Sequence, residues 1–152
     1  MTELNDTSDV ARLLPPVRSF SRPFWDATRE RRVMIQYDRE AGAYQFYPRP
    51  TSIYTGRRHA LEWREVSGRG QIFSFTIVRR AREPFRGHEP YFLTLVTLDE
   101  GINIMSNVRG CPLEEMAVGL RVRPSWLPLP DGRNLLLFEP DSGSVAAAQS
   151  MR

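Results

Sequence analysis

The segment Trp63–Arg80, WREVSGRGQIFSFTIVRR, decides the fold class of this 152-residue chain. From residue 73 onward, large apolar residues recur at every second position, which is the period of a β-strand. The residues expected on one face are Phe73, Phe75 and Ile77, and those on the other are Ser74, Thr76 and Val78. Gly68 and Gly70 precede the alternation and are typical of a bulge or of a close approach between backbones. The segment therefore predicts a turn that leads into a long strand.

Further strands flank this segment in regular order. The expected strands are 61–66, 71–80, 91–98, 102–109, 119–126 and 134–138. A short helical turn at 112–116 separates the fourth from the fifth. The side chains expected inside are Ile102, Ile104, Val108, Leu120, Val122 and Trp126, and those expected outside are Asn103, Asn107, Arg121, Arg123 and Ser125. Five or six antiparallel strands with this helix predict a mainly β fold built on a closed Greek-key barrel of the OB type.

The strand at 91–98 differs from the others because it is apolar on both faces. Leu93 and Leu95 alternate with Phe92, Val96 and Leu98. Such a pattern predicts cover on both sides. We expect the barrel core on the inner side and the N-terminal helix or another chain on the outer side.

The chain upstream of the barrel predicts a helix and a small hairpin module. The helix is short, so it is marginal alone and must dock on another element. The module contains two short hairpins, which are not stable alone and need a metal, the barrel or a partner to hold them. The expected parts are a flexible arm at 1–19, the helix at 20–33, the module at 34–60, the OB-fold at 61–140 and a frayed tail at 141–152.

Composition excludes several classes of protein. No apolar run approaches the roughly 20 residues of a membrane helix. The first nine residues are polar and acidic, so we expect no signal peptide and a cytoplasmic location. Cys111 is the only cysteine, which excludes an internal disulfide framework and argues against a cysteine-based zinc site.

All 21 basic residues counted as Lys+Arg are arginine. The absence of lysine excludes a Schiff-base lysine and a P-loop lysine. Net charge is only +3, but nine arginines and three acidic residues lie between Arg49 and Arg86. This segment could face phosphate, from nucleic acid or from a phosphorylated cofactor, or it could form a solvated surface with local ion pairs.

The order of short motifs along residues 20–140 resembles the domain of unknown function 35 (DUF35) family. The motifs are LEW at 61–63, VSGRG at 66–70, FSFTIV at 73–78, EPY at 89–91, LDEG at 98–101 and VGLRV at 118–122. Upstream, FYPRP at 46–50 resembles the aromatic-Pro-Pro-Arg signature of that family. The resemblance implies an N-terminal helix, a rubredoxin-like zinc ribbon and a C-terminal OB-fold.

The resemblance also implies a function. Family members act as small partner subunits of thiolase-like enzymes that condense, transfer or cleave acyl groups on coenzyme A. We therefore expect a non-catalytic accessory subunit of a thiolase-like or lipid-transfer-protein-like enzyme, or of a related hydratase-like chain. The complex would be a heterotetrameric acyl-CoA lyase or acyltransferase, acting for example in steroid side-chain or aromatic acyl-CoA degradation by a retro-aldol, thiolytic or acyl-transfer step. The acyl-CoA thioester would lie at the interface, and no cofactor of the chain's own is expected.

The chain departs from the family pattern at the zinc site. The positions of the two C-x-x-C knuckles are taken by Asp38 and Ala41 and by Ser52 and Thr55. Of these residues only Asp38 could ligate a metal, so we expect no zinc. The expected replacement is an aromatic set packed on the barrel or on a partner: Tyr37, Tyr44, Phe46, Tyr47 and Tyr54.

The loop Arg79–His88 is the best candidate for contact with coenzyme A or a partner. At a barrel mouth it could bind a coenzyme A phosphate or insert Phe85 into a partner; the alternative is a flexible exposed loop. The full set of expected contact residues is Arg49, Arg79, Arg80, Arg82, Phe85, Arg86 and His88. We expect no catalytic residue. His59 and His88 are expected to be bystanders, Cys111 an inert thiol, and Glu114-Glu115 acids favoured by a first helical turn.

Two other functions remain open from the residues. An OB-fold nucleic-acid binder would use the arginines and exposed aromatics for phosphate contact and stacking. However, the interspersed glutamates and prolines do not form a clean basic groove, so we do not expect nucleic acid as the partner. The second is an independent enzyme. The absence of lysine, of a metal-binding cluster and of a catalytic triad argues against it.

Overall fold

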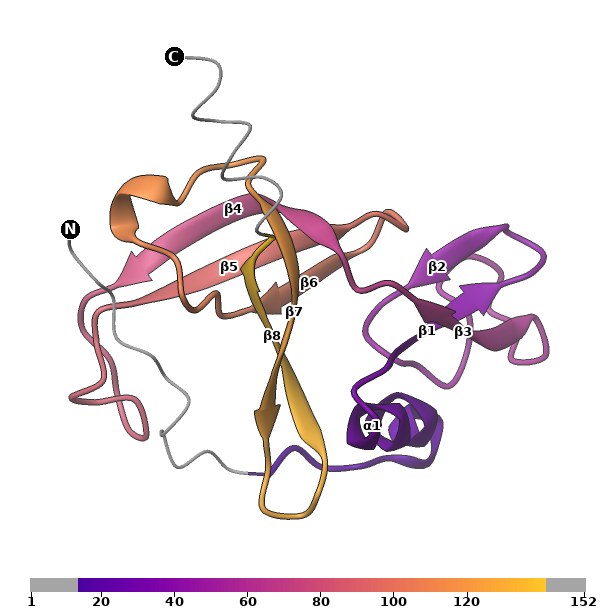
Figure 1. Ribbon diagram of the computed structural model, residues 1–152. Helices are drawn as coiled ribbons and strands as arrows, with labels where there is room; N and C mark the ends of the chain where they lie inside the picture. The colour runs from indigo at the N-terminus through magenta and orange to yellow at the C-terminus, as the bar shows by residue number, and fades with distance from the viewer. Residues whose placement is uncertain (1–13, 142–152) are drawn as a thin grey trace.

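The computed structural model describes residues 14–141, and it is mainly β (Figure 1). The residues 1–13 of the expected arm and 142–152 of the expected tail lie outside this range. Within it the elements are a 3₁₀ turn at Ser19–Ser21, α1 (Arg22–Arg29), β1 (Val33–Asp38), β2 (Ala43–Gln45), β3 (Leu61–Val66), β4 (Gly70–Val78), β5 (Tyr91–Leu98), β6 (Asn103–Ser106), a second 3₁₀ turn at Leu113–Glu115, β7 (Arg121–Pro128) and β8 (Asn134–Pro140). No helix among the described residues is long and apolar enough to cross a membrane.

Five antiparallel strands form a nearly closed barrel in the order β6-β5-β4-β7-β8. The gap between the outer strands is bridged after β6: the N–H of Phe138 donates to the Asn107 carbonyl at 3.0 Å, and the N–H of Arg109 donates to the Phe138 carbonyl at 3.0 Å. The side chains of Ile72, Val96 and Val122 fill the interior and are fully buried. This arrangement confirms the predicted OB-fold.

A β-bulge in β4 corrects the face predicted for Phe73. Ile72 pairs with Val96, but Ser74 pairs with Leu95, so Phe73 is an extra residue in its strand. Because the bulge shifts the alternation, Ile72 points into the core while the Phe73 side chain is 58% exposed. Phe75 and Ile77 share a face as predicted, and that face packs against the core.

Two further predictions about strands were wrong. The strand at 61–66 was expected to be the first of the barrel, but β3 pairs with β1 in a separate sheet, β2-β1-β3. The chain leaves β3 through Gly68, whose φ of +71° permits the sharp turn into β4. Ser125 was expected outside, but it is buried and accepts a hydrogen bond from Nε of Arg109 at 2.7 Å.

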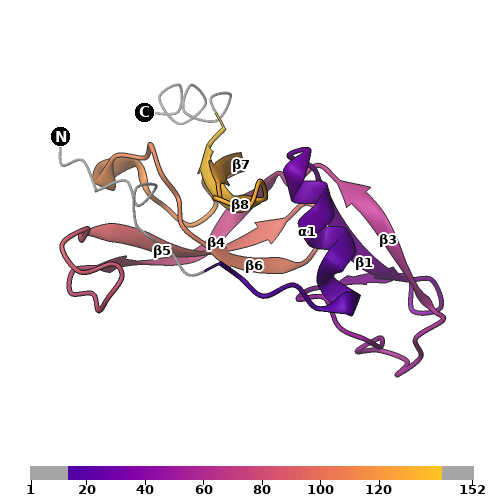
Figure 2. The same cartoon turned by 90° about the horizontal axis from the view of Figure 1, so that it is seen from below.

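Helix α1 lies between the β2-β1-β3 sheet and the barrel (Figure 2). The face of α1 that carries Phe24 and Thr28 is buried, and the Phe24 ring lies 5.7 Å from that of Phe46. The Thr28 carbonyl accepts from the Asn134 side chain at 2.8 Å, which joins the helix to β8. We expected the N-terminal helix or another chain to cover the outer face of β5. Since α1 packs mainly on β1 and β8, the helix is not that cover.

Candidate functional site

The carboxylate of Asp38 occupies the place in the hairpin module where the family resemblance implies zinc. The Asp38 side chain is fully buried at the end of β1. Its Oδ1 accepts from the backbone N–H groups of Glu40 at 2.8 Å and Ala41 at 2.9 Å. Its Oδ2 accepts from the Ser52 hydroxyl and from the Thr55 hydroxyl, the latter at 3.0 Å. Three of the former ligand positions, Ala41, Ser52 and Thr55, therefore bond directly to the carboxylate of the fourth.

This hydrogen-bond hub, made of Asp38, Ala41, Ser52 and Thr55, does not fit a zinc ion. Both oxygens of the carboxylate already accept hydrogen bonds, and Ala41 offers no ligand. The Ser52 oxygen in turn accepts the N–H groups of Tyr54 at 3.0 Å and Thr55 at 3.1 Å. Residues 14–141 contain no group of three or more His, Cys, Asp or Glu side chains suited to a metal.

The hub also changes the acidity of Asp38. The hydrogen bond from Ser52, followed by those from Ala41, Thr55 and Glu40, lowers the pKa of the Asp38 carboxyl to about 2, against the opposing effect of burial. The charged form is therefore the one that the fold stabilises.

The aromatic set predicted to replace zinc accounts for only part of the support. Tyr37 and Tyr44 form an edge-to-face pair 4.9 Å apart, and Phe46 packs against the barrel core. Tyr47 and Tyr54 are 53% and 51% exposed. The hub was missed because the sequence places its residues but does not show that their side chains meet.

A second polar network in the module fixes the chain around Arg49. The Gln36 side chain accepts from the N–H of Arg49 at 2.8 Å and donates to its carbonyl at 2.9 Å. Gln45 donates to Gln36 at 2.8 Å and is itself buried. The side chain of Arg49 is exposed and lines a shallow polar pocket together with Arg58 and Trp63.

The loop between β4 and β5 brings together the other predicted contact residues. Glu89 shapes it by accepting from the N–H of Ala81 at 3.4 Å and of Gly87 at 2.6 Å. The hydrogen bond from its own backbone N–H, followed by those from Ala81 and Gly87, lowers the pKa of its carboxyl. The Phe85 ring lies 5.2 Å from that of Tyr91, and His88 is half-buried. The four arginine side chains, Arg79, Arg80, Arg82 and Arg86, are exposed. Figure 1 shows this loop at the opposite end of the molecule from the module that carries Arg49, so the seven residues do not form one site.

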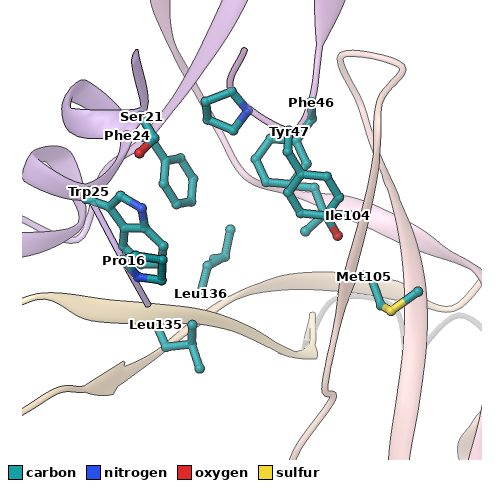
Figure 3. A pocket seen from close by; sticks show the side chains of 11 residues that line it. Pro16, Ser21, Phe24, Trp25, Phe46, Tyr47, Ile104, Met105, Leu135 and Leu136 are labelled. Carbon is teal, nitrogen blue, oxygen red and sulfur yellow. The ribbon is translucent and has the colours of Figure 1, made fainter. Parts of the chain in front are cut away.

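An apolar pocket of about 270 Å³ opens where helix, module and barrel meet (Figure 3). The helix contributes Phe24 and Trp25, and the barrel contributes Leu135 and Met105. The segment after β2 adds Phe46 and Tyr47. Sequence reasoning missed this pocket because its walls come from elements far apart in the chain.

The remaining candidates for chemistry do not converge. His59 lies 3.4 Å from Glu40 on the surface of the module. Cys111 is buried near the barrel core, and burial together with the charge of Glu115 raises the pKa of its thiol to about 11. Since a nucleophilic cysteine needs a lowered pKa, this thiol is suited to packing. Among residues 14–141, these groups do not form a nucleophile–base pair.

Comparison with known proteins identifies the family of the chain. Residues 63–127 match the family described as the C-terminal OB-fold domain of ChsH2. A DUF35 domain-containing scaffold protein of Pyrococcus furiosus is 32% identical over 99 residues, which cover 65% of this chain and 72% of that protein. The chain belongs to the DUF35 family.

Two further relatives are similar over more of this chain. The alpha subunit of 3-oxo-4,17-pregnadiene-20-carboxyl-CoA hydratase of Mycobacterium tuberculosis is 30% identical over 118 residues, which cover 78% of this chain and 37% of that subunit. A probable enoyl-CoA hydratase alpha subunit of Thermomonospora curvata is 26% identical over 91% of this chain and 43% of that protein. The chain thus spans about two fifths of the length of these two relatives.

A solved structure confirms the DUF35 fold. A chain of the Ltp2–ChsH2(DUF35) aldolase superimposes with a TM-score of 0.73 at 24% identity, covering 84% of this chain and 98% of that one. The superposition supports the arrangement of helix, module and barrel described above.

Proposed function

We propose that the chain is a non-catalytic accessory subunit of an enzyme complex that processes acyl-CoA thioesters. The observation that carries the proposal is the similarity over 118 residues to the alpha subunit of a CoA-ester hydratase. The fold shared with the DUF35 chain of an aldolase supports it. The first of these proteins is an alpha subunit, and the second is a chain of the Ltp2–ChsH2(DUF35) aldolase.

The geometry of the described residues supports a non-catalytic role. The histidines lie in different parts of the structure, His59 in the module and His88 in the β4–β5 loop. The only thiol is buried and held protonated. Acid–base or nucleophilic catalysis needs such groups within hydrogen-bond reach of one another, so the chemistry would reside in the partner.

The partner we propose is a thiolase-like or lipid-transfer-protein-like subunit, or a hydratase-like one. The reaction would be a retro-aldol, thiolytic, acyl-transfer or hydration step, and the assembly a heterotetramer. The acyl-CoA would lie near the subunit interface. The apolar pocket between α1 and the barrel supports this, because its Phe24, Trp25 and Leu135 walls suit a hydrocarbon group.

Turnover measurements test the proposal. We expect the purified chain alone to leave acyl-CoA thioesters unchanged. The partner subunit, produced separately, should gain activity or thermal stability when the chain is added in equal amount. Turnover by the chain alone, or a partner that is equally active and stable without it, would refute the proposal.

A further inference from the structure

The outer face of the three strands β4, β5 and β6 carries apolar side chains among uncharged polar ones such as Ser74 and Thr76, and no helix or strand among residues 14–141 packs over it. Cross-strand pairs share a face, so the pairs Ser74–Leu95 and Leu95–Met105 place a row of outward side chains across the sheet. Phe73 joins this row through the bulge. The apolar side chains that define the outer sheet face are Phe73, Val78, Tyr91, Leu93, Leu95 and Met105.

These side chains are open to solvent in the single chain. Phe73 and Met105 are each 58% exposed, and Leu93 and Leu95 are half-buried. The strands β4, β5 and β6 contain no charged residue at all, although 26% of the whole chain is charged. Strands that face water elsewhere in the molecule do carry charges, for example Arg64 in β3 and Arg123 in β7. An uncharged and largely apolar exposed face of this kind is typical of an interaction surface.

One end of the outer sheet face is basic. Val78 and Tyr91 are paired at the base of the β4–β5 loop, and Phe85 of that loop packs on Tyr91. Residues 79–90 carry four arginines against two glutamates, and one of these, Glu89, already accepts hydrogen bonds from the backbone of the loop. Exposed arginine beside an apolar centre is the composition that protein interfaces favour.

We propose that the outer sheet face and the β4–β5 loop together dock the acyl-CoA enzyme subunit. The docking partner presents an apolar patch to Phe73, Leu95 and Met105, with carboxylates beside that patch facing the arginines of the loop. The inference rests on the proposed function. It adds which surface of this chain binds the partner and what chemistry the partner's surface has.

Two other occupants fit less well. In a second copy of the chain packed in parallel, the arginine loops would face each other and repel. In an antiparallel copy the loop would face the turn at Asp99, whose carboxylate already makes two bonds to Arg121 at 2.7 and 2.8 Å. Single-stranded nucleic acid needs aromatic rings spaced along a basic groove, whereas the centre of this face is aliphatic, at Leu93, Leu95 and Met105.

Matched substitutions of exposed apolar residues by glutamate test the inference. The variants are Phe73→Glu and Met105→Glu on the outer sheet face, and Ile53→Glu, 54% exposed, on the module as control. The probe is the acyl-CoA enzyme subunit that co-purifies with the tagged wild-type chain, produced separately as a recombinant protein. We expect the Kd measured by calorimetry to rise by about tenfold or more for the first two variants and to stay within about twofold for the control. Circular dichroism verifies that each variant is folded.

Charge reversal tests the basic end of the surface. Arg80→Glu should slow association with the same subunit several-fold, and the difference in rate from wild type should shrink at high salt.

Three outcomes would contradict the inference. If the wild-type chain binds the subunit, and Phe73→Glu and Met105→Glu bind it with the same Kd, the inference is overturned and the proposed function stands. Failure of the wild-type chain to bind any acyl-CoA enzyme subunit would remove both. Self-association in ultracentrifugation that Phe73→Glu abolishes would assign the face to a second copy and overturn the partner proposed here.

Discussion

At the scale of single residues, the carboxylate of Asp38 is the centre of the module, at the position where the family resemblance implies zinc. It bonds to the backbone of the β1–β2 turn and to the hydroxyls of Ser52 and Thr55 in the later loop. A zinc ion would join these two segments by four bonds to side chains. Here hydrogen bonds to one buried anion join them, and bonds to charged groups are stronger than those between neutral groups.

Asp38→Asn should destabilise the chain by about 1–3 kcal/mol, because the amide nitrogen cannot accept the bonds that one carboxylate oxygen accepts now. Denaturant unfolding measures the loss. Glu40→Gln serves as the control, since the Glu40 side chain pairs only with the exposed groups of Arg57 and His59. A cost for Asp38→Asn no larger than that of the control would show that the hub does not hold the module.

The lowered pKa of Asp38 predicts how stability depends on pH. Folding lowers this pKa from 3.8 to about 2, so the folded state binds the proton less well than the unfolded state. The contribution of Asp38 is therefore fully present above about pH 4 and is lost as the pH falls toward 2. Unfolding free energies of wild type and Asp38→Asn, measured from pH 5 to pH 2, should converge as the pH falls. A constant difference across this range would contradict the lowered pKa.

The sequence located the four former ligand positions by their spacing but could not show how they are used. Asp, Ser and Thr are all common in turns, so each could have bonded within its own turn. Their meeting depends on the closure of a loop of more than ten residues, which no local pattern records. The same limit applies to the apolar pocket, whose walls at Phe24, Phe46 and Leu135 are distant in the chain.

At the scale of elements, the bulge in β4 decides which side chains face the core. Period-two alternation correctly predicted that this segment is a strand and that Phe75 and Ile77 share a face, which in the structure packs against the core. It failed at Phe73 because one inserted residue shifts the phase and leaves no signature in the pattern of apolar residues. The assignment of β3 to the barrel failed for a related reason: strand patterns reveal strands but not their neighbours.

The bulge can be tested by two neighbouring substitutions. Ile72→Ala should cost about 2–5 kcal/mol because Ile72 is fully buried in the barrel core. Phe73→Ser should change the stability of the isolated chain by less than about 0.5 kcal/mol, because its ring is mostly in solvent. Denaturant unfolding compares the two. A larger loss of unfolding free energy for Phe73→Ser than for Ile72→Ala would contradict the bulge and favour the simple alternation.

At the scale of the whole molecule, helix α1 joins the module to β8. The outer sheet face has no helix or strand packed over it within the part of the chain that the structure describes. The sequence predicted this need for cover from the double-faced apolar pattern of β5, although it did not distinguish the helix from another chain. The position of α1 on β1 and β8 leaves another chain as the cover that we propose.

The docking surface and the pocket both depend on the chain working as the accessory subunit of an acyl-CoA enzyme. The most direct test is native mass spectrometry of the assembly recovered from the host with a tagged form of the chain. The account predicts a stoichiometric thiolase-like, lipid-transfer-protein-like or hydratase-like subunit, with the two chains in equal number. Recovery of the chain alone, or of the chain with nucleic acid in place of an enzyme subunit, would contradict it.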